Sequence, residues 1–350
     1  MIGRIIMAAG VWLSAWAAGV AAAGEPFRLG IIGLDTSHAV AFTKVFNADT
    51  PPDDPAEAKL LAGFRVVAAT PLGSLDIVSS TSRREKITAD VASLGVAVVD
   101  SIETLLPLVD GVLLETNDGR PHLAQARQVI AAGKPLFIDK PVAASLSDVL
   151  TIYRLAEQAS VPIFSSSTLR FAPATAAVRA GSVGPVLGCD ASSPCGLEPT
   201  HPDLFWYGIH GVETLFTCMG IGCEAVSRTH TPTSDLVVGR WADGRLGSFR
   251  GMREGKQLYG GRAYGRDGTA ELGPPAGYRP LVLEIARFFR SGKPPVSQAE
   301  TIEIYAFMEA AHESTRRGGE TVRLDEVLNK ARPEADTTTM QQRESTSTRP

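Results

Sequence analysis

Hydrophobic and polar residues alternate along the first part of the chain in a pattern that predicts parallel β-strands separated by helices. The apolar runs lie at residues 28–32, 64–70, 95–100, 110–116 and 135–141. Near-continuous apolar strands that alternate with helical segments are typical of a parallel sheet with helices on both faces. We therefore predict an α/β fold with a doubly wound parallel sheet in a first domain at residues 24–144.

The pattern changes in the second half of the chain. A helix is predicted at 145–159 and is followed by long alternating stretches at 235–253 and 256–272. Both stretches contain Asp-Gly turns, which are typical of antiparallel strands. We predict a C-terminal substrate and oligomerisation domain at residues 145–332. The tail at residues 333–350 has no apolar period, so we predict that it is disordered.

The first 23 residues resemble a targeting segment. Arg4 is the only charge before an uncharged stretch at residues 5–23, which ends in Ala21-x-Ala23. A positive start, an apolar middle and a small-residue end are typical of a secretory signal peptide. The alternative is an uncleaved membrane anchor. Because no basic stop follows the apolar stretch, we predict cleavage, export to the periplasm or the medium, and no stable membrane insertion afterwards.

The composition and charge of the chain indicate which kinds of partner to expect. The 350 residues are 44% hydrophobic and carry a formal net charge of −4. A basic footprint is missing, so we predict no nucleic-acid partner.

The cysteines leave three alternatives open. In an exported protein four cysteines can pair as disulfides, or they can remain buried free thiols. Their spacings are not those of the usual zinc sites, so no metal centre is predicted. The four residues are Cys189, Cys195, Cys218 and Cys223.

The turn after the first strand begins like a dinucleotide fingerprint and then departs from it. Gly33 can form the tight turn of G-x-G-x-x-G, but Asp35 and His38 replace the second and third glycines. A carboxylate at the second position repels a pyrophosphate at close range. We predict that Asp35 instead caps the following helix, with Thr36 and Ser37 assisting.

Two residues elsewhere are candidates for acid–base chemistry. Lys140 follows the strand predicted at 135–141, at the rim where open α/β sheets bind ligands. Partial desolvation would lower its pKa and make it a general acid or base; the alternative is a solvated lysine in a turn. His210 lies beside aromatic residues and could hold a hydroxyl or shuttle a proton, or could be a packed histidine.

Residues 27–328 resemble the Gfo/Idh/MocA family, named for glucose–fructose oxidoreductase, inositol dehydrogenase and a rhizopine-catabolism protein. One anchor is a helix in which His210 is followed three residues later by Glu213. The best anchor matches the family's H-x10-G-K…E-K-P arrangement in order and spacing, through His122, Gly133, Lys134, Asp139, Lys140 and Pro141. The resemblance implies a Rossmann domain followed by an α/β domain with a large mixed, mostly antiparallel sheet, whose open face supports homo-oligomers.

The resemblance also implies an activity: hydride transfer between NAD or NADP and a sugar or cyclitol. Lys140 would act on the reacting hydroxyl or carbonyl, and His210 would be its partner at that oxygen. Asp139 stands where the family has glutamate and would orient near the nicotinamide ribose. The residues implied to contact the cofactor are Gly33, Asp35, Thr36, Ser37, His38, Asn117, His122 and Asp139.

Several loops depart from the family pattern and support an alternative. Thr70-Pro71 follows the second strand, where an acid would meet the adenosine ribose, and Asn117-Asp118 replaces a threonine–proline. Trp206 stands where the family often has aspartate. The alternative is a cofactor-free carbohydrate-binding protein, or a non-redox lyase or hydrolase, on the same fold. Its polar contacts to the ligand would come from Asp35, His38, Arg120 and His210.

Overall fold

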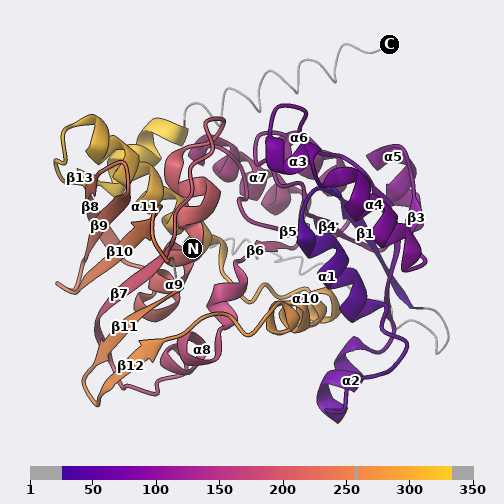
Figure 1. Ribbon diagram of the computed structural model, residues 1–350, viewed down its shortest axis with the longest axis horizontal. Coiled ribbons are helices and arrows are strands. Elements are labelled where there is room, and N and C mark those ends of the chain that lie inside the picture. Colours follow the sequence, from indigo (N-terminus) through magenta and orange to yellow (C-terminus); the bar gives the residue numbers. More distant parts are fainter. Residues whose placement is uncertain (1–25, 257–258, 333–350) are drawn as a thin grey trace, which may run out of the picture.

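The computed structural model describes residues 26–256 and 259–332. The predicted signal peptide and the predicted disordered tail lie outside these residues. Figure 1 shows two sheets, one in each half of the molecule, with helices packed on them. Within the described residues, no helix combines the length and apolar character needed to cross a membrane.

The first sheet is parallel throughout and confirms the predicted Rossmann-like domain. Its strand order is β3-β2-β1-β4-β5-β6. The order reverses between β1 and β4, and ligands of such sheets bind in the crevice at the carboxyl ends of the strands at that point. The strands are β1 (Phe27–Ile32), β2 (Phe64–Thr70), β3 (Ala97–Val98), β4 (Gly111–Leu114), β5 (Leu136–Ile138) and β6 (Ile163–Ser165).

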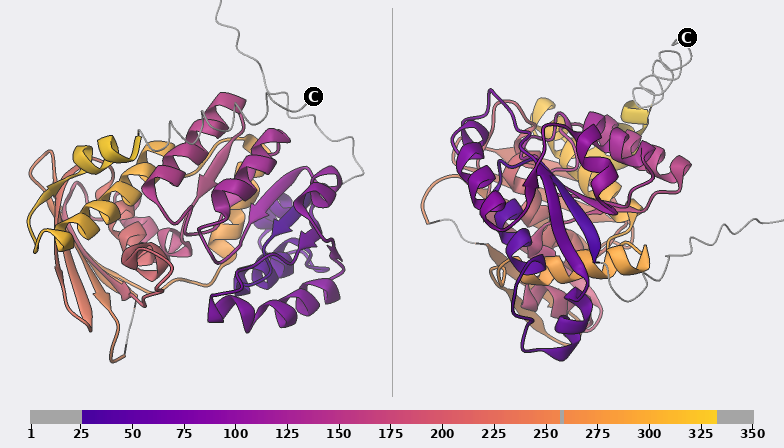
Figure 2. Two further views of the ribbon diagram at one scale, coloured as in Figure 1. Left: turned by 90° about the horizontal axis from the view of Figure 1, so that it is seen from above. Right: turned by 90° about the vertical axis from the view of Figure 1, so that its right-hand side faces the viewer.

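Helices cover both faces of this sheet (Figure 2). The predicted boundary at residue 144 falls before the last elements of the sheet, because α7 leads into β6, and β6 pairs in parallel with β5. The helices are α1 (Ser37–Phe46), α2 (Pro55–Leu61), α3 (Val78–Thr81), α4 (Arg84–Ser93), α5 (Ile102–Leu105), η1 (Leu106–Leu108), α6 (His122–Ala131) and α7 (Leu146–Ala159).

The second sheet is mixed, as predicted. Its order is β12-β11-β7-β10-β9-β8-β13, and β7 and β10 pair in parallel while the other pairs are antiparallel. The strands are β7 (Val186–Pro194), β8 (Cys223–His230), β9 (Ser234–Trp241), β10 (Leu246–Met252), β11 (Gly260–Gly265), β12 (Thr269–Leu272) and β13 (Val322–Arg323).

One face of the second sheet packs against α9, which is buried along its whole length, and against α11. A π-helix, η3, runs directly into α9. A third long helix, α10, returns to the first domain and packs its Ile285 and Phe288 in the same apolar cluster as Leu29. The elements are η2 (Thr168–Phe171), α8 (Pro173–Arg179), η3 (Leu204–Gly208), α9 (Ile209–Met219), α10 (Arg279–Ser291) and α11 (Gln298–Arg316).

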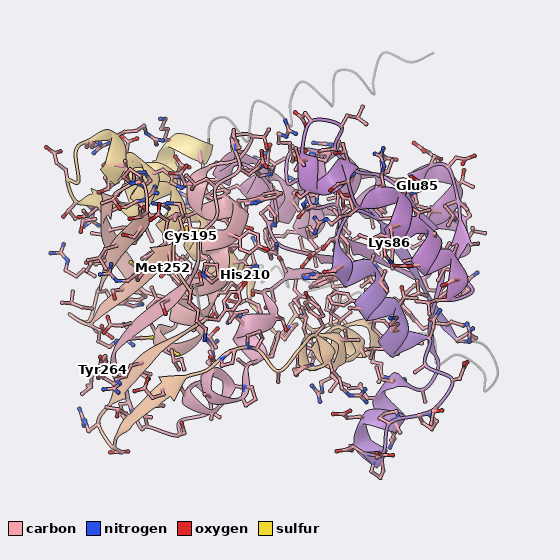
Figure 3. The ribbon with its side chains drawn as sticks, in the orientation of Figure 1. Glu85, Lys86, Cys195, His210, Met252 and Tyr264 are labelled. Carbon is pink, nitrogen blue, oxygen red and sulfur yellow. The ribbon has the colours of Figure 1, made fainter. Side chains whose placement is uncertain are left out.

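The second sheet also bears exposed apolar side chains. Leu187, Leu246 and Tyr264 are exposed, and Figure 3 labels Tyr264 near the edge of the molecule. Such a surface is compatible with the predicted homo-oligomer, which stays a prediction.

The four cysteines are free, buried thiols. The sequence left open disulfides, free thiols or a metal centre, and the structure has free thiols. Cys189 and Cys218 lie within hydrogen-bond distance of each other, and this contact together with burial raises the pKa of Cys189 far above its usual value.

Candidate functional site

A pocket of about 440 Å³ lies between the two domains, at the carboxyl ends of β1, β4 and β5. Its position is the one expected for the ligand site of an open parallel sheet. Figure 3 labels His210 in this central region. The lining residues are Thr36, Ser37, His38, Ser79, Arg83, Asn117, Lys140, Thr168, Leu169, Trp206, Tyr207, His210, Tyr259, Pro275, Gly277 and Tyr278.

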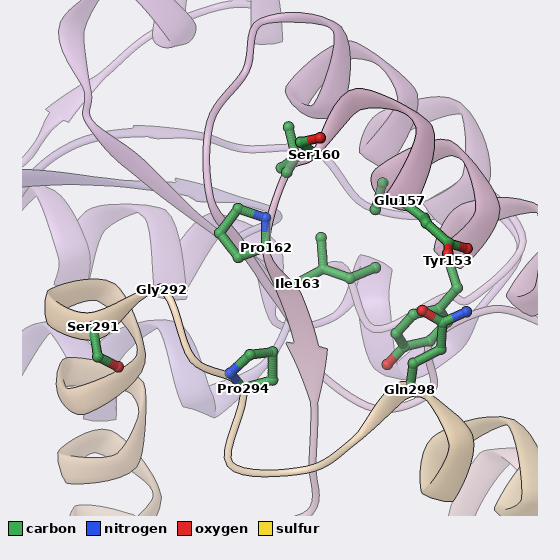
Figure 4. Close-up of a pocket in the computed structure, with 11 residues that line it drawn as sticks. Tyr153, Glu157, Ser160, Pro162, Ile163, Ser291, Gly292, Pro294 and Gln298 are labelled. Atoms are coloured by element: carbon green, nitrogen blue, oxygen red, sulfur yellow. The ribbon is translucent and has the colours of Figure 1, made fainter. Parts of the chain in front are cut away.

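Figure 4 shows a second cavity, of about 450 Å³, at the amino end of β6, whereas the first pocket lies at the carboxyl edge of the sheet. It lies between the end of α7 and the segment after α10, and its lining includes Glu157, Pro162 and Gln298. It contains none of the residues that the sequence predicted for the site, so the interdomain pocket is the candidate functional site.

Lys140 brings a cation to the pocket from the loop after β5. Its ammonium lies 5.5 Å from the centre of the Tyr207 ring, and it makes no ion pair within the described residues. Burial lowers the pKa of Lys140; the nearby charge of Asp139 opposes this shift and that of Arg83 adds to it. A lysine with a lowered pKa can exchange a proton with a ligand oxygen closer to neutral pH.

His210 reaches the pocket from the second domain, at the start of α9. Its Nδ1 lies 2.7 Å from the hydroxyl of Ser167, which accepts a hydrogen bond from the backbone N–H of Leu169. The Ser167 hydroxyl can then donate its proton to Nδ1, an arrangement in which the neutral His210 ring carries its proton on Nε2. Burial, reinforced by Lys140 and His38, holds the pKa of His210 well below its usual value. The ring is thus neutral at neutral pH.

Tyr207 connects these two residues. Its ring centre lies 5.5 Å from that of His210 and 5.5 Å from the Lys140 ammonium. The ring of Tyr259 contacts His210 from another side, with centres 5.9 Å apart. The pocket therefore presents two polar groups from different domains on an aromatic wall, which is how many small-ligand sites are built.

A buried ionic network holds the Ser167 loop against His210. Arg170 donates through Nε to Glu213 at 2.8 Å and through Nη1 to Glu300 at 2.7 Å. Glu213 also lies 3.4 Å from the Ser167 backbone N–H. Glu213, the acid that follows the family histidine by three residues, therefore positions the loop instead of lining the pocket.

The prediction that Asp35 caps the first helix is wrong. Thr36 is the capping residue, with its hydroxyl 3.4 Å from the His38 backbone N–H. Asp35 is completely buried, and its carboxylate accepts hydrogen bonds from the Ser80 hydroxyl at 2.6 Å and from the Asn117 backbone N–H at 2.9 Å. These donors lie across the crevice, and the carboxylate turns toward them instead of toward the helix.

His38 lies at the third fingerprint position and forms part of the pocket wall. Its Nδ1 is 2.7 Å from the carboxylate of Asp139, which is buried behind it. The ring is held between Tyr278, with centres 4.5 Å apart, and Phe42, with centres 5.4 Å apart. Asp139 thus contacts His38, and through it supports the pocket.

Other contacts tie the loop after β2 to the loop after β4. Arg120 pairs with Asp76 at 2.6 Å and with Asp118 at 2.7 Å, and the Ser74 hydroxyl donates to Asp118. Together with Asp35, these contacts cross the carboxyl edge of the sheet.

The residues at the carboxyl edge of the first sheet decide whether a dinucleotide can bind there. In this fold the pyrophosphate requires bare backbone at the second fingerprint position, and the adenosine half lies along the end of β2. Here the Asp35 carboxylate fills the first region, and the Ser74–Asp118 and Asp76–Arg120 contacts hold the β2 loop against the β4 loop. The residues present do not fit a dinucleotide in that position.

The other residues that the resemblance implied to contact the cofactor do not all line the pocket. Thr36, Ser37 and Asn117 line the pocket. Gly33 has φ of +99°, and a Cβ there would lie 2.4 Å from the Thr116 backbone nitrogen, so the turn requires glycine.

His122 lies away from the pocket lining and is fully buried. Its Nε2 is 2.8 Å from the Thr116 carbonyl oxygen and its Nδ1 is 3.2 Å from that of Val142. It therefore joins the loop after β4 to the loop after β5. Within the described ranges, no cluster of side chains suits a metal ion.

The fold and the site define a class: two-domain proteins with a Rossmann domain and a pocket at the carboxyl edge of its sheet. Residues 61–167 match the GFO_IDH_MocA family model, described as an oxidoreductase family with an NAD-binding Rossmann fold. The family resemblance predicted from the sequence is therefore confirmed, with the sequence match centred on the Rossmann domain. No curated protein matches the chain in sequence.

Solved structures share the fold across both domains. A putative myo-inositol dehydrogenase from Sinorhizobium meliloti has a TM-score of 0.69 at 16% identity, covering 85% of this chain and 100% of that one. The Lactobacillus casei myo-inositol dehydrogenase, in complex with NAD(H) and myo-inositol, has a TM-score of 0.67 at 17% identity, covering 85% and 97%. A probable dehydrogenase from Thermotoga maritima has a TM-score of 0.65 at 21% identity, covering 86% and 99%.

Proposed function

We propose that this chain binds a carbohydrate-like or cyclitol-like polyol in the interdomain pocket without a dinucleotide. The observation that carries the proposal is the convergence of Lys140 and His210 on one aromatic wall, beside a dinucleotide region that Asp35 and its partners fill. In this proposal one ligand oxygen lies between the Lys140 ammonium and the His210 Nε2–H. The aromatic rings face the C–H groups of the ligand.

The two polar groups have complementary properties. His210 is neutral. When the Ser167 hydroxyl donates to Nδ1, the ring carries its proton on Nε2 and can donate it to a ligand oxygen. Lys140 has a lowered pKa, so it gives up its proton more readily than a solvated lysine, and its neutral amine is populated closer to neutral pH. This pair binds a hydroxyl and can move its proton, which suits ligand binding and non-redox acid–base chemistry.

Hydride transfer between NAD(P) and a sugar or cyclitol is a second candidate. The family match and the arrival of Lys140 and His210 in the same pocket favour it. It requires the loop after β2 to leave Asp35 and to expose the end of β2. The two candidates therefore differ in one measurable property, the affinity of the folded chain for a dinucleotide.

The test is a pair of titrations on the chain that begins at Gly24. We expect NADH and NADPH to leave nicotinamide fluorescence and the melting temperature unchanged at micromolar concentrations. Polyols are expected to raise the melting temperature, and Lys140→Met is expected to weaken their binding roughly tenfold, about 1.4 kcal/mol. Lys134→Met, in the turn before β5, is the matched control because Lys134 does not line the pocket. Micromolar NADH binding would favour hydride transfer instead.

We further propose that residues 1–23 direct export and are removed. The support is the charge and small-residue pattern of that segment. In a host that expresses the full chain, we expect the exported form to begin at Gly24. Amino-terminal sequencing of the exported fraction checks this, and a full-length, membrane-bound product would support the anchor alternative.

A further inference from the structure

The charges that line the pocket are unbalanced. Arg83, from the turn between α3 and α4, and Lys140 both line it, and no carboxylate does among the described residues. Neither cation makes an ion pair with a described carboxylate, in contrast to Arg120 and Arg170, each of which pairs with two. The whole chain has a net charge of −4, so this local excess does not follow from composition.

Arg83 is oriented by its backbone surroundings. Its Nε donates to the Ser79 carbonyl oxygen at 2.5 Å, and Ser79 itself lines the pocket. This bond uses one of the five guanidinium N–H groups and leaves the two terminal amino groups without a carboxylate. A planar guanidinium with free terminal groups is suited to binding a carboxylate or a phosphate through two parallel hydrogen bonds.

The amino end of α1 adds to the positive potential that Arg83 and Lys140 create in the pocket. Thr36 and Ser37 line the pocket, and α1 continues for ten residues from Ser37. The first N–H groups of a helix and its dipole favour an anion. Asp35 holds the second fingerprint position, with its carboxylate bonded to Ser80 and Asn117, so the part of this helix end that faces the pocket is Thr36 and Ser37.

Asp139 and Asp35 lie close to the pocket, but both are buried and hydrogen-bonded. Asp139 lies behind His38, with which it pairs at 2.7 Å, and both are buried. Asp35 is buried with both of its oxygens in hydrogen bonds. Neither acid forms an ion pair with Arg83 or Lys140. The charge of Asp35 acts on Arg83 and that of Asp139 acts on Lys140, but both cations still face the pocket and can attract a negative group on the ligand.

We infer that the ligand is an anionic polyol: a sugar-sized molecule that carries a carboxylate or a phosphate. Its anionic group lies between Arg83 and the amino end of α1, and a hydroxyl lies between Lys140 and His210. This inference rests on the proposed function, because it names the class of ligand for the same pocket.

Calorimetric titration of the chain from Gly24 onward tests the inference with matched ligands and no dinucleotide. The neutral probes are glucose and myo-inositol, the carboxylates are gluconate and glucuronate, and the phosphate is glucose 6-phosphate. We expect at least one anionic probe to bind at least tenfold more tightly than its neutral counterpart. Its affinity is expected to fall as the salt concentration rises. The stronger anionic arm identifies a carboxylate or a phosphate as the preferred group.

Arg83→Met is expected to remove most of this preference and to leave the affinity for the neutral probes within about twofold. Arg84→Met is the matched control: Arg84 is the next residue, and its guanidinium lies 3.4 Å from the Gly73 carbonyl oxygen, outside the pocket lining. We expect Arg84→Met to keep the preference. Circular dichroism shows whether both variants fold.

Each outcome has one meaning. Equal affinities for neutral and anionic probes would overturn the anionic ligand and leave the polyol site. An equal loss of the preference in the Arg83 and Arg84 variants would overturn the assignment of Arg83. Binding of no probe by the folded chain would overturn both this inference and the proposed function. Tight binding of anionic probes that Arg83→Met does not change would overturn the assignment of Arg83.

Discussion

Replacing Arg170 with methionine is expected to lower the free energy of unfolding by roughly 3–5 kcal/mol, because it leaves buried carboxylates without their counter-charge. Arg170 is 5% exposed, and it contacts Glu213 and Glu300, which are 3% and 4% exposed. Burial alone would raise the pKa of both acids, and Arg170 opposes this in each. Denaturant unfolding of the parent and the variant measures the loss.

The control for this prediction is Arg179→Met. Arg179 also pairs with Glu300, at 2.9 Å, but its side chain is 46% exposed. Because solvent screens the charge of the half-exposed Arg179, a smaller loss than in Arg170→Met is expected. If the two variants lose the same stability, the buried network is not what holds this region.

The same substitution connects stability to the site. Glu213 contacts the Ser167 loop as well as Arg170, and Ser167 fixes the proton of His210. A folded Arg170→Met chain is therefore expected to bind polyols more weakly, although Arg170 does not line the pocket.

Much of the first domain could be predicted from the sequence because its strands are short, apolar and separated by helices. The run at 64–70 coincides with β2, and the helix predicted at 145–159 is α7, with its cap at Ser145. The strand predicted at 95–100 is reduced to Ala97–Val98, because it lies at the sheet edge and pairs only with β2. The π-helix η3 was not predicted, since its apolar pattern does not distinguish it from an ordinary helix.

The site could be predicted only where the motif residues also line the pocket. Lys140 and His210 both line it, as the family resemblance implied. The role of Asp35 was wrong because its partners Ser80 and Asn117 are 45 and 82 residues away, and a local pattern shows only the nearby helix. Arg83 and Ser167 were missed for a related reason. Ordinary residues in loops gain a role only when the fold brings them to the pocket.

Glu115 is expected to make the stability of this protein fall as the pH rises above its usual pKa of 4.5. The residue follows β4 and is fully buried, and its two carboxylate oxygens have no hydrogen-bond partner among the described residues. Burial, and then the charges of Asp139 and Asp35, raise the pKa of Glu115 well above that value. The group is therefore a neutral acid over a wide range of pH.

The sign of the effect follows from proton linkage. A carboxyl group with a higher pKa in the folded chain than in the unfolded chain binds its proton more tightly when folded. Its contribution is fully present below the unfolded pKa and is lost as the pH rises toward the folded pKa. One proton corresponds to about 1.4 kcal/mol per pH unit while the pH lies between the unfolded and the folded pKa.

Glu115→Gln isolates this contribution because glutamine has nearly the same shape and does not ionise. We expect the stability of the parent to fall relative to the variant by up to about 1.4 kcal/mol per pH unit above roughly pH 5, measured by urea unfolding at several pH values. Asp35 and Asp139, whose charges act on Glu115, are present in both chains, so the difference between the two curves cancels most of their effect. Glu103→Gln, at an exposed acid, is the control and should give a curve nearly parallel to the parent's in this range. A Glu115→Gln curve parallel to the parent's would mean that Glu115 ionises at its ordinary pH, in contact with solvent.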